Sequence, residues 1–169
     1  MTAPTGVAQK LYATRNSLPA AAREQVAGLL NRRLADAIDL LSQCKQAHWN
    51  VKGPQFIALH KLFDEVHAGV TDYVDQIAER VVQLGGIAEG TIRVAAERSE
   101  LDEYPIVMAD GADHVKCLSV ALAAFGSRMR FAVQEMDELE DVGSADLCTQ
   151  VSRGIDQWLW FVEAHLQQS

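Results

Sequence analysis

Residues 59–84 read LHKLFDEVHAGVTDYVDQIAERVVQL, and the periodicity of this stretch decides the fold. At 100° per residue, its apolar side chains share one helical face, which must be buried in a core. The members of that face are Leu59, Leu62, Phe63, Val66, Val70, Tyr73, Ile77, Val81 and Leu84. The pattern predicts a long amphipathic helix from about Gln55 to Leu84, ended by the glycine pair 85–86.

A first helix of about 30 residues is predicted before this one, because apolar side chains recur at helical spacing from Val26 to His48. We expect Ser17 to cap its start, with Pro19 in the first turn. The run Lys52-Gly53-Pro54 should end it and turn the chain.

Residues 87–109 form a long connection, in which Thr91 to Ser99 predict a short helix. A third long helix should run from near Asp110 to about Glu138, and Ser144 should cap a fourth that ends near His165. The fold class is therefore all-α: a four-helix bundle of ferritin-like topology, with a short helix in the long crossover between helices two and three. We expect a flexible tail over residues 1–16 and one bundle domain over residues 17–169.

The composition suits a single globular domain, with 49% apolar residues in a chain of 169. No apolar run is long enough for a membrane span, and residues 1–10 lack the pattern of a signal peptide. Cys44, Cys117 and Cys148 form no CxxC pair, which indicates buried thiols in the reducing cytoplasm. A net charge of −8 argues against unassisted binding to polyanions and suits a protein that attracts cations.

A second face of the helix over residues 55–84 is polar and carries His60, Asp64, Asp75 and Glu79 within an arc of about 100°. His60 with Asp64, and Asp75 with Glu79, are i,i+4 pairs, each able to converge on one ion. Imidazole with carboxylates is a ligand set that suits iron or manganese.

The two pairs are too far apart to hold one ion within a single chain, because 15 residues of helix span roughly 22 Å. Two copies of this helix, antiparallel about a two-fold axis, would bring His60 and Asp64 of one beside Asp75 and Glu79 of the other. His48 lies five residues before Gly53, so the hairpin places it at the level of His60. The pattern thus favours a metal site shared between subunits.

Two ordinary alternatives remain open at this point. The charged face can be simply solvated, and His48 can be a core histidine with a satisfied hydrogen bond. Other chemistry finds little support, since the chain has no ExxH motif for a di-iron centre inside one bundle. It also lacks HExxH, GxSxG, GxGxxG and P-loop motifs.

The stretches KQAHWNVKGPQFIALH (residues 45–60), DQIAER (residues 75–80) and LGG (residues 84–86), with the spacing of the five candidate ligand positions, resemble the Dps family of mini-ferritins. The resemblance covers nearly the whole chain. It extends to Gly90-Thr91, Tyr104-Pro105, the Ser-Ala-Asp run 144–146, and DQWLWFVE over residues 156–163.

The resemblance implies a shell of twelve identical subunits that oxidises Fe(II), with hydrogen peroxide preferred over O2, and stores ferric mineral. It implies at most two irons at each site, which would be held by His48, His60 and Asp64 from one subunit and Asp75 and Glu79 from its neighbour. Other divalent metals could occupy the same ligands. Trp49 matches a family aromatic that could donate an electron, with simple packing as the alternative, and His67 could support the ligands from one turn beyond Asp64.

Acidic residues crowd the turn before the last helix, where family resemblance implies an iron-entry pore. The candidates are Glu140, Asp141 and Asp146, flanked by Asp137 and Glu138. Two rival functions remain: a nucleoid-associated, DNA-compacting protein with secondary iron binding, and an acidic helical scaffold without metal chemistry. DNA binding is expected to be weak or absent, because the predicted tail holds only Lys10 and Arg15 as basic residues.

Overall fold

A computed structural model describes residues 11–167, and its regular elements in that range are five helices. Four are long: α1 (Ala20–Asn50), α2 (Phe56–Gln83), α4 (Gly111–Glu138) and α5 (Val142–Glu163). The short α3 (Ile92–Arg98) lies in the crossover between α2 and α4, with Thr91 as its N-cap. These helices confirm the all-α bundle with one long crossover.

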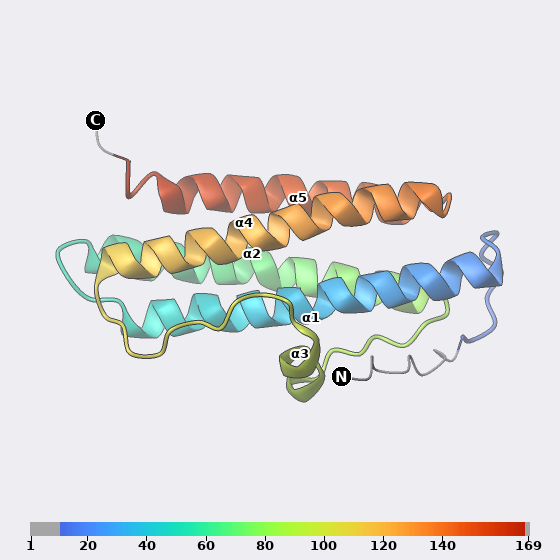
Figure 1. Cartoon of the computed structure of the whole chain (residues 1–169), viewed down its shortest axis with the longest axis horizontal. Helices are drawn as coiled ribbons and strands as arrows, with labels where there is room; N and C mark the ends of the chain where they lie inside the picture. The colour runs from blue at the N-terminus through green and yellow to red at the C-terminus, as the bar shows by residue number, and fades with distance from the viewer. Residues whose placement is uncertain (1–10, 168–169) are drawn as a thin grey trace, which may run out of the picture.

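The bundle consists of two antiparallel hairpins, α1 with α2 and α4 with α5 (Figure 1). The crossover runs along the outside of α1, where α3 packs, and returns to the far end of the molecule before α4 begins. The Lys52 N–H donates to the Ala109 carbonyl at 2.8 Å, which ties the end of α1 to the segment that leads into α4. The α1–α2 turn and the start of α4 are therefore held together at one end of the bundle.

All four long helices contribute to one hydrophobic core, as their apolar faces predict. The α2 face places Leu59, Phe63 and Ile77 at 1% exposure or less. The largest fully buried side chains are Leu30, Leu34, Leu40, Leu59, Phe63, Ile77, Leu84, Leu118, Leu122, Phe125, Met129 and Met136. This face fixes the rotation of α2 about its axis. The polar stripe of α2, made of His60, Asp64, Asp75 and Glu79, therefore points away from the subunit's own core.

Two predicted helix caps are wrong. Pro19, not Ser17, occupies the N-cap of α1, and no side chain caps that helix. Asp141, not Ser144, caps α5 by accepting a hydrogen bond from the Ser144 N–H, because the helix begins at Val142. The other predicted helix ends agree with the structure to within about two residues.

The predicted N-terminal tail is described only from Leu11 onward, and residues 1–10 lie outside the described range. Residues 11–16 form no helix, but the Tyr12 N–H donates to the Gly85 carbonyl at 2.7 Å. Gly85 has φ +87°, and a Cβ there would lie 2.5 Å from the Tyr12 carbonyl oxygen. Glycine is therefore needed at this position, both for the left-handed turn and for the close approach of the chain.

Candidate metal centre

The two predicted histidine ligands, His48 at the end of α1 and His60 at the start of α2, lie face to face. Their ring centroids are 3.7 Å apart, with 21° between the planes. The hairpin turn produces this stacking, because the break at Gly53 brings the last turn of α1 beside the first turns of α2. The prediction that the turn places both histidines at one level is confirmed.

Each of these histidines is bonded to the other's backbone. His48 Nδ1 lies 2.7 Å from the His60 carbonyl oxygen, and His60 Nδ1 lies 2.8 Å from the His48 carbonyl oxygen. A carbonyl oxygen can only accept, so both Nδ1 atoms must carry the proton and donate. Within residues 11–167, no hydrogen bond engages Nε2 of either ring. When Nδ1 carries the only ring proton, Nε2 of each imidazole has a free lone pair, which is the arrangement that metal-ligating histidines use.

Asp64 lies on the exposed side of α2, one turn after His60, where its carboxylate pairs with the Lys45 ammonium of α1. The hydrogen bond from Lys45 holds the pKa of the Asp64 carboxyl below its ordinary value, with smaller contributions from the charges of Lys45, His48 and His67. The carboxylate is therefore ionised and available to a cation near neutral pH. An incoming metal ion must compete with Lys45 for it.

Asp75 and Glu79 are exposed near the other end of α2, one turn apart. Their distance along the helix from His60 and Asp64 follows from α2 being continuous over Phe56–Gln83. Among residues 11–167 of one subunit, no three His, Cys, Asp or Glu side chains come together as a metal site. Any site that uses both pairs must therefore include a second subunit.

Trp49 and His67 flank the histidine end of the stripe. Trp49 is 69% exposed, so its ring is not buried within the subunit. His67 is half-buried, and burial is the largest cause that lowers the pKa of its imidazole, while the Lys45 ammonium adds to this and the Asp64 carboxylate opposes it. His67 therefore shares the electrostatic environment of Asp64 and Lys45.

The acidic turn divides into one structural carboxylate and several exposed ones. Asp141 is 2% exposed, accepts from Arg80 Nη2 at 2.8 Å and bonds the Ser144 hydroxyl at 2.5 Å. The carboxylate of Asp141, one of the pore candidates, is therefore already engaged as the cap of α5 and as the partner of Arg80. Glu140 and Asp146 are exposed, as are Asp137 and Glu138.

Sequence reasoning missed two features of the site. Lys45 precedes His48 by one turn of α1, and this i,i+3 spacing could have identified it as a neighbour of the ligands. The reciprocal bonds between His48 and His60 had no signal in the sequence, because they depend on the hairpin geometry.

Comparison with known proteins now adds to this geometry. The ferritin-like domain family matches residues 27–169. The DNA protection during starvation protein of Agrobacterium fabrum is 43% identical over 159 residues, which cover 94% of this chain and 98% of that protein.

Solved structures agree with this match. DpsA14 from Streptomyces coelicolor has a TM-score of 0.91 and 34% identity, covering 96% of both chains. Dps from Microbacterium arborescens, solved in the high iron form, has a TM-score of 0.83 and 34% identity, covering 93% of this chain and 100% of that one. The matched family model, the sequence identity and the shared fold agree: this chain belongs to the Dps family of ferritin-like proteins.

Proposed function

We propose that this protein oxidises Fe(II), preferentially with hydrogen peroxide, at sites shared between two subunits, and stores the ferric product inside a shell of twelve subunits. The carrying observation is the reciprocal pair of Nδ1 bonds between His48 and His60, which leaves both Nε2 atoms free to bind a metal. The proposed setting is the cytoplasm, where Cys44, Cys117 and Cys148 stay as free thiols.

The partner subunit is proposed to complete the site with its own Asp75 and Glu79. If two α2 helices run antiparallel with His60 level with Glu79 of the partner subunit, Asp64 is level with the partner's Asp75. The same alignment sets Ile57 level with Val82 of the partner subunit. Ile57 and Val82 are each 58% exposed in one subunit. One alignment therefore both assembles the ligands and covers two exposed apolar side chains, which supports it.

In this site the histidines would hold Fe(II), and the carboxylates would favour the Fe(III) product, because a higher charge gains more from anionic oxygen ligands. Two Fe(II) ions supply one electron each, so hydrogen peroxide is reduced to two hydroxide ions and no hydroxyl radical is released. Lys45 would leave Asp64 when iron binds and keep the empty site neutralised otherwise. The solved high iron form of the Microbacterium arborescens relative agrees with iron as the substrate.

Anaerobic loading with Fe(II), followed by peroxide, tests this function. The wild type should develop a lasting ferric absorbance and consume one peroxide for two irons. Asp64→Ala should lose most of the initial rate, whereas Glu65→Ala, at the exposed neighbouring position, should keep it. Absence of ferric product in an intact wild-type shell would instead favour a scaffold without metal chemistry.

A further inference from the structure

A buried tyrosine–histidine pair lies in the core and takes no part in the proposed iron site. The Tyr104 hydroxyl oxygen is 2.6 Å from His114 Nδ1, with Tyr104 9% exposed and His114 1% exposed. Tyr104 comes from the crossover, just before α4, and His114 from the first turn of α4. Their ring planes are 16° apart.

This pair lies on the core side of the α1–α2 hairpin, which carries the proposed iron ligands. The His114 ring lies 6.4 Å from the ring of Phe63, the residue directly before Asp64. The backbone of Asn50, two residues after His48, also faces the His114 ring. The pair therefore contacts the end of α1 and the core face of α2, the two helices that carry the proposed ligands.

The arrangement suits oxidation of a phenol with transfer of its proton to a base. Burial is the main cause that raises the pKa of Tyr104 and lowers the pKa of His114, so the resting pair is a neutral phenol beside a neutral imidazole. In the tautomer protonated at Nε2, His114 Nδ1 accepts from the Tyr104 O–H. An oxidised phenol is a strong acid, and this base lies already within hydrogen-bonding distance.

The iron chemistry creates a need for such a donor. Reduction of hydrogen peroxide to two hydroxide ions takes two electrons, and a site that holds a single Fe(II) supplies one. Without a second donor, cleavage of the O–O bond by one electron yields a hydroxyl radical.

We propose that Tyr104, with His114 as its proton acceptor, supplies the second electron when a site holds only one Fe(II). This inference rests on the proposed iron-oxidising function. In the step, peroxide takes one electron from Fe(II) and one from Tyr104, and its O–O bond breaks to give two hydroxide ions. Fe(III) and a neutral Tyr104 phenoxyl radical remain, and the phenol proton moves to His114 Nδ1. Tyr104 thus loses one electron to peroxide and one proton to His114, so both electrons and protons are accounted for.

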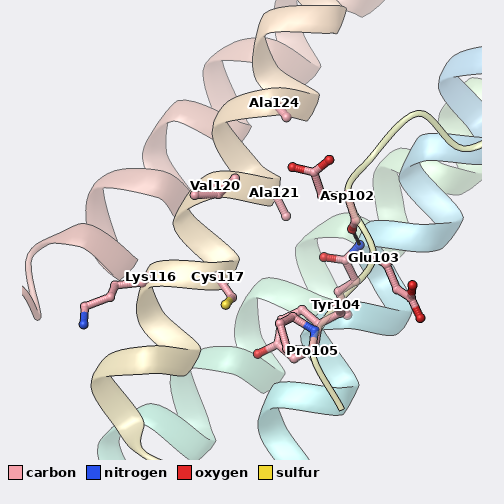
Figure 2. Close-up of a pocket in the computed structure, with 10 residues that line it drawn as sticks. Asp102, Glu103, Tyr104, Pro105, Lys116, Cys117, Val120, Ala121 and Ala124 are labelled. Atoms are coloured by element: carbon pink, nitrogen blue, oxygen red, sulfur yellow. Dashed lines mark hydrogen bonds between the residues drawn. The ribbon is translucent and has the colours of Figure 1, made fainter. Parts of the chain in front are cut away.

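The phenoxyl radical would have access to small reductants through a pocket of about 280 Å³. Figure 2 shows Tyr104 and Pro105 on the crossover side of this pocket, and Cys117, Val120 and Ala121 on the α4 side. A small thiol or ascorbate entering here could return a hydrogen atom to the tyrosine. The pocket thus supplies a route for resetting the pair that avoids the iron ligands.

Electron paramagnetic resonance on wild-type shells, loaded with one Fe(II) per site and frozen after peroxide addition, tests the proposal. We expect a tyrosyl signal that narrows when the protein contains ring-deuterated tyrosine, which separates it from a radical on Trp49. Tyr104→Phe should abolish the signal and increase hydroxyl radical caught by a spin trap. His114→Gln should lower the radical yield, because the proton acceptor is lost.

Tyr12→Phe and Tyr73→Phe are matched controls, since they replace the other two tyrosines of the chain. Both should keep the signal, and shell size should be unchanged in all variants. A tyrosyl signal that survives Tyr104→Phe, or a wild type that forms ferric product without any tyrosyl signal, overturns the inference and leaves the proposed function intact. A wild type that forms no ferric product at all refutes the proposed function itself.

Discussion

At the scale of single residues, backbone carbonyls decide which ring nitrogens of His48 and His60, the candidate ligands, remain free. The alternative of an ordinary core histidine described His48 as satisfied, and its Nδ1 is indeed bonded to a carbonyl oxygen. That bond satisfies Nδ1 and leaves the lone pair of Nε2 free. A core histidine and a metal ligand therefore differ only in whether a metal ion binds Nε2. His48 and His60 were identified from the sequence by residue type and spacing, whereas their tautomers required the hairpin.

Replacing Lys45 by methionine should raise the pKa of Asp64 toward its ordinary value. The hydrogen bond from Lys45 is the largest cause of the lowered value, and the methionine side chain has no donor. A lowered carboxyl pKa stabilises the fold above the unfolded-state pKa, and this contribution is lost as the pH falls through the folded-state value. Carbon NMR titration of the Asp64 carboxyl checks this prediction, and an unchanged pKa in the variant would contradict it.

At the scale of helices, the periodic pattern predicted the elements well, because each long helix buries a continuous apolar face. The two wrong caps were Ser17 and Ser144, which suit a cap by residue type. In the structure, the N-cap of α1 is Pro19. The N-cap of α5 is Asp141, three residues before Ser144, because the compact turn 139–141 lets the last helix begin at Val142. Residue type alone could not favour Asp141 over Ser144 as the helix cap, because Arg80, the partner that holds Asp141 in place, is 61 residues away in the sequence.

Asp141→Ala should destabilise the subunit by about 2–4 kcal/mol, because it removes a helix cap and one partner of a largely buried ion pair. Arg80 Nη2 and the Ser144 hydroxyl would both lose their acceptor. Chemical denaturation measures the change in the free energy of unfolding. Asp146→Ala, at an exposed position on the same helix, should change it by less than about 0.5 kcal/mol. Equal effects of the two substitutions would refute the structural role assigned to Asp141.

At the scale of the whole molecule, the exposed carboxylates of the acidic turn are predicted to line an entry pore for iron. Glu140→Gln with Asp146→Asn should slow initial iron oxidation and flatten its dependence on ionic strength, because a negative pore concentrates cations. Asp141 is excluded from this test, since its loss is expected to unfold the turn. Stopped-flow absorbance on shells of verified size gives the rates; unchanged rates would mean that iron enters elsewhere.

The assembled protein is also predicted to bind DNA weakly or not at all, despite the names of its relatives. The proposed shell of twelve subunits, at −8 each, would carry a formal charge of −96, which repels phosphate. A gel shift with duplex DNA at moderate salt, without divalent cations, should show no stable complex. Mg²⁺ added in a parallel sample would reveal bridging by a divalent cation, and a complex without it would contradict the prediction.

None of the helices within residues 11–167 is long and apolar enough to cross a membrane. The four long helices bury one core and leave the candidate ligands of α2 on the outside. This division was predictable from the sequence, because apolar and polar positions of α2 occupy separate faces. The proposed contribution of a partner subunit rests on the length of helix between the two pairs of candidate ligands.

Hybrid shells test the shared site most directly. One parent carries His60→Ala and Asp64→Ala, and the other carries Asp75→Ala and Glu79→Ala, so each lacks one half of every site. Random mixing at equal amounts should restore about one quarter of the sites, because half of the two-fold interfaces are mixed and each of those holds one intact site. Initial Fe(II) oxidation near that fraction of the wild-type rate is the predicted result. Hybrid shells of correct size that stay as inactive as both parents would contradict a site built from two subunits.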